Sequence, residues 1–195
     1  MITVSTMNDF MELHKPWIRE SNLIEGIDDP VADQDSFDAW RRFTEVNLNI
    51  FTVLRAHGDI MWRNNKRIAG EFRKCNVSVG YRNCPNFKDV PNLMKKWFEV
   101  YRDADTFQKI KEAHIIFERI HPFADGNGRT GRMILNWQLM KCEHEIVCIY
   151  AVKRGDYYKW FAEEAIYWKG SLAVGKPRVS FLEQFFRRKE KDIEL

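Results

Sequence analysis

Apolar residues recur at three- and four-residue steps through most of this chain, and this spacing restricts the fold more than any other feature of the sequence. The first such pattern covers residues 10–24 and closes at Gly26. A second is expected to begin at Ser36, a candidate N-cap, and to end near His57. An apolar helix is expected to begin directly after Gly126 and Gly128, and further helices are expected over residues 92–101, 106–120, 156–168 and 179–189. We therefore predict an all-α fold.

One short stretch departs from the helical spacing. In NVSVGY, residues 76–81, the side chains of Val77, Val79 and Tyr81 alternate with smaller or polar ones, which predicts a short extended piece followed by a loop. No internal repeat, low-complexity tract or linker is visible, and 195 residues suffice for one domain with a sizeable core. The sequence thus indicates a single globular unit with one small hairpin.

Charge and cysteine content narrow the classes of partner. The 31 basic and 28 acidic side chains leave a net charge of only +3, so a nucleic-acid partner is not expected. The four cysteines form no C-x-x-C pair, and CEHEIVC (residues 142–148) matches no common zinc spacing. No apolar run is long enough for a membrane span and no secretion signal is visible, so we expect a cytoplasmic protein with reduced thiols.

The stretch HPFADGNGRTGR, residues 121–132, separates two of the expected helices. Gly126 and Gly128 allow tight turns that can point successive amide N–H groups the same way, at the start of the apolar helix. Arg129 and Arg132 are three residues apart and are expected on one face of its first turn. Guanidinium groups match phosphate oxygens, so the stretch predicts a phosphate-binding site.

Two further residues suggest a reaction at this site. Asp125 would repel a phosphate unless a cation lay between them, and Mg²⁺ accepts both ligands. His121 titrates near neutrality, as a general base must. A polar surface turn with a structural histidine explains each residue alone but not their combination. His57 and His114, by contrast, have apolar neighbours at helical spacing and are expected to be structural.

At every fixed position the stretch resembles the Fic family signature, H-x-F-x-[D/E]-G-N-G-R-x-x-R. AGEFR (residues 69–73) with VSVG (77–80) resembles the family's helix and flap hairpin, and AHIIFERI (113–120) resembles the helix before the signature. RGDYY (154–158) is similar to the segment that contacts the nucleotide base. The resemblance covers roughly residues 16–170 and implies a compact helical Fic-type fold with a small β-hairpin flap.

The resemblance implies a protein adenylyltransferase, which moves AMP from ATP to a Ser, Thr or Tyr hydroxyl of a target protein, the chain itself included. His121 would deprotonate the hydroxyl, and Asp125 would hold Mg²⁺ or Mn²⁺ on the phosphates. The residues implied to cradle or neutralise the phosphates are Gly126, Asn127, Gly128, Arg129 and Arg132.

Two more elements are implied to contact the substrates. The flap residues Val77, Ser78, Val79 and Gly80 would dock the target segment as an added strand. For Tyr157 and Tyr158 two interpretations stay open, a ring stacked on adenine or packing in the core.

Upstream, SNLIEG (residues 21–26) reads as a helix end with a glycine C-cap. It also fits the family's inhibitory pattern [S/T]-x-x-x-E-[G/N]. The resemblance then implies that Glu25 pairs with Arg132 and takes the position of the γ-phosphate. Residues 1–35 would form an N-terminal segment with the inhibitory helix, and residues 36–195 the Fic core.

Three other functions remain open. The first is phosphotransfer of the Doc type, against which the intact GNG argues. The second is removal of AMP, with the inhibitory glutamate as base. The third is a non-catalytic regulatory or toxin-like interaction module, against which His121 and both arginines argue. Analogy with the family leaves a homodimer open, and the sequence does not fix the oligomeric state.

Overall fold

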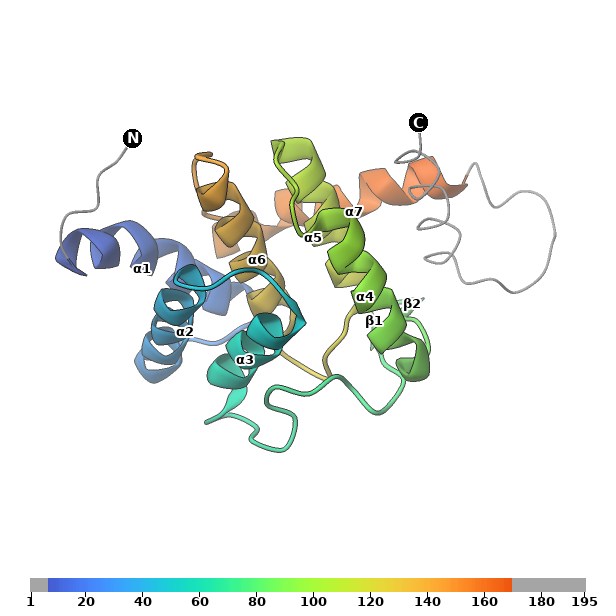
Figure 1. Ribbon diagram of the computed structural model, residues 1–195, viewed down its shortest axis with the longest axis horizontal. Helices are drawn as coiled ribbons and strands as arrows, with labels where there is room; N and C mark the ends of the chain where they lie inside the picture. Colours follow the sequence, from blue (N-terminus) through green and yellow to red (C-terminus); the bar gives the residue numbers. More distant parts are fainter. Residues whose placement is uncertain (1–6, 170–195) are drawn as a thin grey trace.

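Helices make up most of residues 7–169, the part of the chain that the computed structural model describes (Figure 1). The seven α-helices in this part are α1 (Met7–Ile24), α2 (Pro30–Thr44), α3 (Ile50–Met61), α4 (Val90–Tyr101), α5 (Phe107–Ile120), α6 (Asn127–Lys141) and α7 (Arg154–Lys169). Two short 3-10 turns precede α4 and α7, namely η1 (Phe87–Asp89) and η2 (Ala151–Lys153). The predicted all-α fold is confirmed.

Helix α6 is the centre of the packing. It contacts α5, α3, α1 and α2, and nearly all its side chains from Asn127 to Leu139 are buried. The sequence predicts this arrangement, because apolar residues occur on all sides of α6 rather than on one stripe. The largest fully buried side chains around it include Trp40, Trp97, Phe117 and Phe123. Because α6 packs against four helices, the core fixes the position of its N-terminus.

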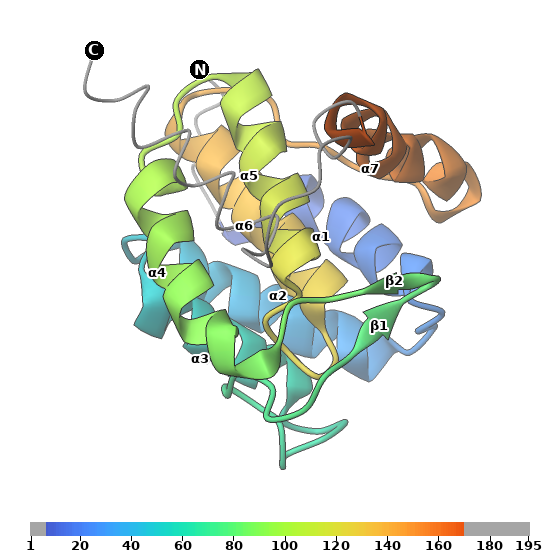
Figure 2. The same ribbon diagram turned by 90° about the vertical axis from the view of Figure 1, so that its right-hand side faces the viewer.

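The expected hairpin is present. Strands β1 (Ser78–Val79) and β2 (Arg82–Asn83) pair antiparallel, with Val79 opposite Arg82. Gly80, at φ +57, begins the turn between them. Figure 2 shows the hairpin standing away from the helices, and its strand residues are exposed.

The second helix is where the sequence prediction is wrong, because two helices replace the single one expected from Ser36 to His57. Helix α2 begins earlier, where Asp29 accepts the N–H of Val31 at 3.0 Å. Ser36 instead lies inside α2 and donates a hydrogen bond to α1. Asn49 caps a new helix with a capping box. Both helices bury one face in the same core, but Phe51, which continues the apolar spacing into α3, is 78% exposed.

The other predicted helices differ less from the structure. Helices α4, α5 and α7 match the predicted ranges to within about two residues at each end, as is usual for helix boundaries. Residues 69–73, which resemble a helix of the family, form irregular turns here. The helix expected over residues 179–189 lies outside the described residues. Between residues 7 and 169, no helix combines the length and the apolar character that crossing a membrane requires.

Polar contacts fasten the end of α1 to α2. Asn22 donates to Asp33 at 2.8 Å and accepts from Ser36 at 3.3 Å. Arg19 forms ion pairs with Asp33 and with Asp28, in the turn after the helix. These contacts hold the end of α1 and the turn after it against α2.

The cap of α3 can be tested directly. We expect Asn49→Ala to lower the free energy of unfolding by about 1 kcal/mol, because the N–H groups of Phe51 and Thr52 would lose their acceptor. Urea unfolding measures the change. Asn47→Ala is the matched control, since only the backbone oxygen of this exposed residue accepts a hydrogen bond. Equal effects of the two substitutions would contradict the capping role.

Candidate active site

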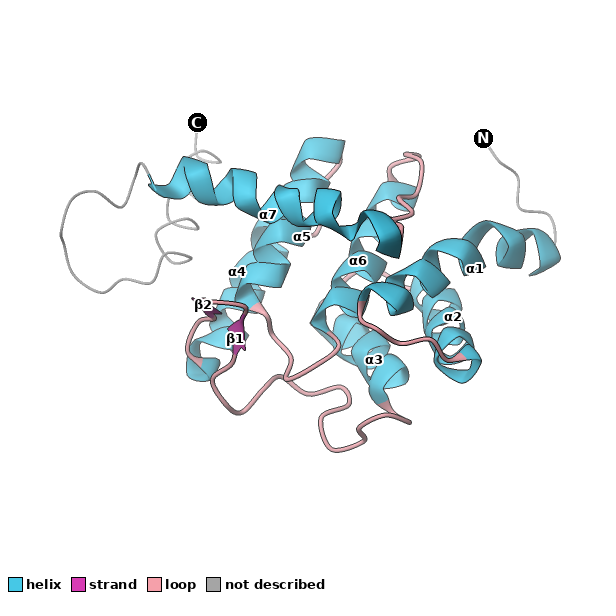
Figure 3. Cartoon of the chain, turned by 180° about the vertical axis from the view of Figure 1, so that it is seen from behind, coloured by secondary structure: helices cyan, strands magenta, loops and turns pink. Residues whose placement is uncertain are grey.

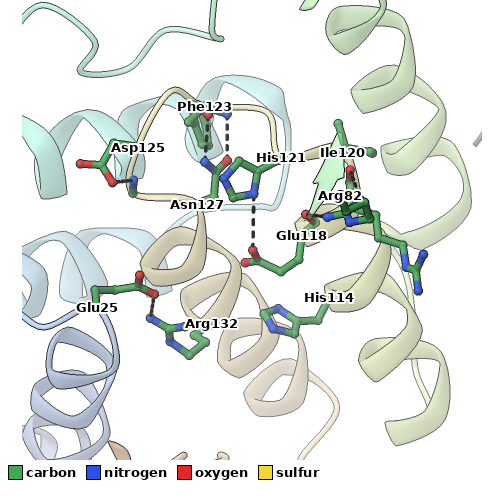
Figure 4. Close-up of polar contacts among 12 residues, drawn as sticks. Glu25, Arg82, His114, Glu118, Ile120, His121, Phe123, Asp125, Asn127 and Arg132 are labelled. Atoms are coloured by element: carbon green, nitrogen blue, oxygen red, sulfur yellow. Dashed lines mark hydrogen bonds and ion pairs between the residues drawn. The ribbon is translucent and has the colours of Figure 1, made fainter. Parts of the chain in front are cut away.

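His121 ends α5 in the left-handed backbone region, at φ 50 and ψ 64, while its N–H still bonds to the carbonyl oxygen of Phe117. This region is uncommon for a residue with a side chain. The chain therefore turns sharply after α5, and the imidazole lies beside Glu118, one helical turn earlier (Figure 4). The side chain of His121 is 19% exposed, so it can still be reached from solvent.

The loop after His121 is held by its own side chains. The Asn127 amide accepts from the backbone N–H of Phe123 at 2.8 Å and donates to the carbonyl of the same residue at 2.9 Å. Phe123 is fully buried and stacks on the ring of His57, with centroids 3.7 Å apart and planes 2° apart. The side chain of Asn127 thus shapes the loop, which leaves its backbone N–H at the helix start for a ligand.

His57 is structural, as expected, but its contacts lie in the candidate site. The N–H of Gly70 donates to Nδ1 at 3.0 Å, so the ring proton is on Nε2, which donates to the carbonyl oxygen of Asp125 at 3.0 Å. Burial lowers the pKa of His57 to about 4 and keeps the ring neutral. A contact across 68 residues leaves no pattern in the sequence, so this role could not be predicted.

A buried arginine connects the base of the hairpin to the same loop. Arg73 is 3% exposed and donates to the carbonyl oxygens of His121 at 2.8 Å, Cys75 at 2.9 Å and Pro85 at 2.6 Å. From β2, Arg82 reaches the carbonyl oxygens near the end of α5. Cations suit the C-terminus of a helix, where the dipole is negative. These contacts fix the hairpin relative to His121.

The start of α6 has the geometry of an anion site. Its N-cap, Gly126, has φ +74, and a Cβ there would lie 2.8 Å from the sulfur of Met61. The first amide N–H groups of a helix have no partner within the helix and favour anions. At Gly128 a Cβ would collide with the carboxylate of Glu25. The group that lies nearest to Gly128 at this helix start is therefore itself an anion.

Glu25 and Arg132 form the ion pair that the sequence predicts. The guanidinium donates to Glu25 Oε1 at 2.6 Å, and to the hydroxyl and carbonyl oxygens of Ser21 at 2.8 and 2.9 Å (Figure 4). The Arg132 side chain is 3% exposed and that of Glu25 is 37% exposed. A buried guanidinium thus takes its acceptors from the last turn of α1.

Arg129 is placed differently from Arg132. Its guanidinium is buried and contacts the sulfur of Met61 at 3.0 Å. Its Nε and a second terminal nitrogen have no hydrogen-bond partner among residues 7–169. Asp125 is exposed and accepts the N–H of Gly126 at 2.7 Å with one oxygen, which leaves the other for a cation. No three acids, cysteines or histidines gather into a metal site within this part of the chain.

A cavity of about 490 Å³ opens beside these residues, between the hairpin, α5, α6 and α7. Figure 3 shows α7 crossing α5 and α6 above the hairpin. A volume of 300–1,000 Å³ is usual for small-molecule sites. The lining includes eight residues that the sequence singles out, namely Glu25, Val79, Gly80, His121, Gly128, Arg132, Tyr157 and Tyr158. It also includes Arg82, Glu118, Arg119 and Phe161, for which no motif gave a signal.

The two tyrosines differ. Tyr157 is 5% exposed, its hydroxyl bonds to His114 Nε2 at 2.8 Å, and its ring lies 5.8 Å from the Arg132 guanidinium. This is the packed arrangement, and His114 is structural, as expected. Tyr158 is 48% exposed at the cavity wall and leaves a ring face for a ligand.

The sequence model described as the Fic/DOC family matches residues 47–139. The chain belongs to this family. Two relatives named "Protein adenylyltransferase Fic" are each 32% identical to it. The one from Aedes aegypti matches over 168 residues, 81% of this chain, and the one from Drosophila erecta over 120 residues, 58% of this chain. The chain spans 32% and 24% of the length of these relatives.

Solved Fic structures share the fold. A Fic family protein from Desulfovibrio desulfuricans superposes with a TM-score of 0.69 at 22% identity, covering 97% of this chain and 67% of that one. Fic-1 from C. elegans superposes with a TM-score of 0.63 at 17% identity, covering 99% and 68%. The seven helices and hairpin described above are therefore a Fic fold.

Buried imidazoles should make this Fic fold sensitive to acid. Burial lowers the pKa of His14, His57 and His121 to about 4, and that of His114 to about 3, from 6.5. Below pH 6.5 the unfolded chain therefore binds more protons than the fold, and acidification lowers the free energy of unfolding. Burial raises the pKa of Glu118 to about 7, so acidification raises the free energy of unfolding through this group. One such group opposes the four histidines.

We expect the thermal unfolding midpoint to fall steadily between pH 6.5 and pH 4.5. His14→Gln should flatten this dependence, because it removes one of the buried imidazoles far from the cavity. His144→Gln, at an exposed position, should leave it unchanged. An unfolding midpoint that stays constant over this pH range would contradict the prediction.

Proposed function

We propose that this Fic domain is a protein adenylyltransferase, which moves AMP from ATP to a Ser, Thr or Tyr hydroxyl of a protein. One observation carries the proposal. A cavity of about 490 Å³ brings a neutral imidazole, the start of α6 and a buried guanidinium to one wall. The names of the curated relatives supply the reaction class.

In the proposed reaction His121 takes the proton from the target hydroxyl. The hydroxyl oxygen then bonds to the α-phosphorus, the bond from that phosphorus to the bridging oxygen breaks, and pyrophosphate leaves. Burial lowers the pKa of His121 to about 4, below the near-neutral value that the sequence predicts, so the ring is unprotonated at neutral pH and can accept a proton. Little covalent chemistry is required of the protein, whose work is positioning and charge stabilisation.

The phosphates would lie at the start of α6. Backbone N–H groups of Asn127 and Gly128 point out of a helix N-terminus there, and Arg132 supplies a positive charge beside them. Arg129, with two unsatisfied nitrogens, is the second cation of this proposal. Preorganised donors of this kind stabilise charge that develops on a transferring group.

A divalent cation fits the remaining carboxylate. Asp125 keeps one oxygen free at the exposed edge of the loop, and Mg²⁺ is commonly held by one or two carboxylates together with substrate phosphates. Asp125 would hold Mg²⁺ or Mn²⁺ there. The bound ion would supply charge neutralisation for the phosphate oxygens of ATP.

The target segment would dock on the hairpin, the flap of this proposal. Residues Val77 to Gly80 carry the exposed strand β1, whose backbone is paired on one side only. An extended peptide could add to that edge and bring its hydroxyl toward His121, since Val79, Gly80 and His121 line the same cavity. The contacts of Arg73 would hold the flap at a set distance from the base.

Glu25 makes the resting enzyme inactive in this proposal. Its carboxylate lies against Gly128 and binds Arg132, so it occupies the place where an ATP phosphate would meet the same arginine. A guanidinium bound to Glu25 and Ser21 has few donors left for a phosphate. ATP would then bind with its α-phosphate out of line with the target hydroxyl.

The test uses ATP labelled at the α- or the γ-phosphate, with Mg²⁺, and follows label on the chain itself. We expect Glu25→Gly to raise α-label about tenfold over wild type, because loss of the carboxylate leaves the buried Arg132 guanidinium free to bind a phosphate. Adding His121→Ala should abolish it. Asp28→Gly is the matched control, as it removes an exposed carboxylate of the same turn that pairs with Arg19.

Other outcomes point elsewhere. Label from the γ-phosphate alone would mean phosphotransfer. Release of AMP from a modified protein by wild type, lost in Glu25→Gly, would mean AMP removal. Absence of label from every variant would favour the non-catalytic module. If Glu25→Gly labels no better than Asp28→Gly, Glu25 does not inhibit.

A further inference from the structure

Glu118 is a buried carboxylate in the cavity that no part of the Fic signature includes. It lies on α5, one turn before His121, and its side chain is 12% exposed. Its Oε1 has no hydrogen-bond partner within the described chain. A buried carboxylate oxygen without a hydrogen-bond partner destabilises the fold. A functional role would explain why a glutamate occupies this position.

The nearest titratable nitrogen belongs to the base. Glu118 Oε2 lies 3.9 Å from His121 Nδ1 (Figure 4). Within residues 7–169 that nitrogen makes no hydrogen bond of good geometry, and the backbone carbonyl of Glu118 is the other acceptor that acts on it. The left-handed turn at His121 brings this about, because it folds the imidazole back over the last turn of α5, where residue 118 faces it. A carboxylate with one unpartnered oxygen and a ring nitrogen without a well-formed hydrogen bond therefore lie beside each other.

Gly131 makes room for this carboxylate. A Cβ at that position would collide with Glu118 Oε1 and would come within 3.1 Å of the ring of Phe117. The signature leaves position 131 open, so it does not account for a glycine there. The space kept by Gly131 lets the carboxylate stay between α5 and α6, next to His121.

We propose that Glu118 is a positioning residue for His121, whose carboxylate accepts the Nδ1–H and leaves Nε2 as the proton acceptor. The inference rests on the proposed function. When the target hydroxyl gives its proton to Nε2, the ring becomes an imidazolium, and the adjacent carboxylate stabilises that charge. No proton moves to Glu118, and the Nδ1–H stays on the ring. A shift of about 1 Å closes the contact to hydrogen-bond length, and such contacts tighten when substrates bind.

The surroundings of Glu118 decide how much of it is ionised. Burial raises its pKa to about 7, Arg132 on α6 and Arg82 on β2 oppose that rise, and Glu25 after α1 adds to it. His114 and Tyr157 also lie on this side of α5 and are uncharged at neutral pH. Removal of Glu25 therefore favours the ionised form, so the variant freed from inhibition also gains a stronger partner for its base.

The first experiment needs no turnover. Nitrogen-15 NMR of the full chain with labelled histidines reports which ring nitrogen carries the proton at pH 7, and His121→Ala assigns the signal. We expect the Nδ1–H form to dominate for His121 in Glu25→Gly. Adding Glu118→Gln should shift the population toward Nε2–H, because the neutral amide is a weaker acceptor. Glu99→Gln, an exposed change on α4, should leave it unaltered.

The second experiment measures rates in the Glu25→Gly background. We expect Glu118→Gln to lower kcat for α-label transfer about tenfold, within the range that general-base catalysis supplies, with an unchanged KM for ATP. Gly131→Ala should lower kcat in the same way, since it displaces the carboxylate but keeps its charge. Unfolding temperatures establish that both variants fold.

The proposal is overturned if the Nδ1–H population of His121 in Glu25→Gly stays the same when Glu118→Gln is added. A rise in KM for ATP without a fall in kcat, together with lost discrimination against 2′-deoxy-ATP, also overturns it, since Glu118 would then bind the ribose. If Glu25→Gly transfers no label but the tautomer shifts as expected, the adenylyltransferase function fails while the Glu118–His121 contact stands.

Discussion

The burial of Arg132 is the constraint on which the site depends. A guanidinium that is 3% exposed must find acceptors inside the protein, since an unpaired buried charge is strongly destabilising. Within residues 7–169 its hydrogen-bond acceptors are Ser21, in the last turn of α1, and Glu25, just after that helix, while Tyr157 of α7 packs against it. A contact that satisfies Arg132 would therefore also fill the place that the proposed function gives to a phosphate. The proposed inhibition would then follow from placing a permanent cation in the interior of the fold.

The loop that follows His121 is held in place largely by residues distant in sequence. His57 on α3 and Arg73 before the hairpin bind its backbone carbonyls, and Asn127 closes the loop from within. All three use side chains to satisfy backbone groups that a buried loop would otherwise leave unpaired. The same contacts connect α3, the hairpin and the start of α6, so the distance from the flap to His121 is set by the core.

Much of this could be predicted from the sequence, for identifiable reasons. The helices follow from apolar spacing, and the partnership of Glu25 with Arg132 follows from a short pattern upstream of a long one. The break between α2 and α3 was missed because the stripe from Trp40 to Leu54 crosses it, and the capping box at Asn49 is a weaker signal than five apolar residues. Glu118 was missed because a glutamate inside a helix is ordinary in sequence. Only the left-handed turn at His121 and the space at Gly131 make it unusual.

Three charges at the cavity wall are linked. Arg132 lies between Glu25, which it binds directly, and Glu118, whose pKa it helps to lower against the effect of burial. A phosphate that took the place of Glu25 on Arg132 would bring its own negative charge toward Glu118 and would raise its pKa again. The carboxylate would then stay ionised only if a divalent cation at Asp125 and the donors of α6 neutralised the phosphates. Metal binding, release of Glu25 and the strength of the base would thus be parts of one electrostatic balance rather than three separate requirements.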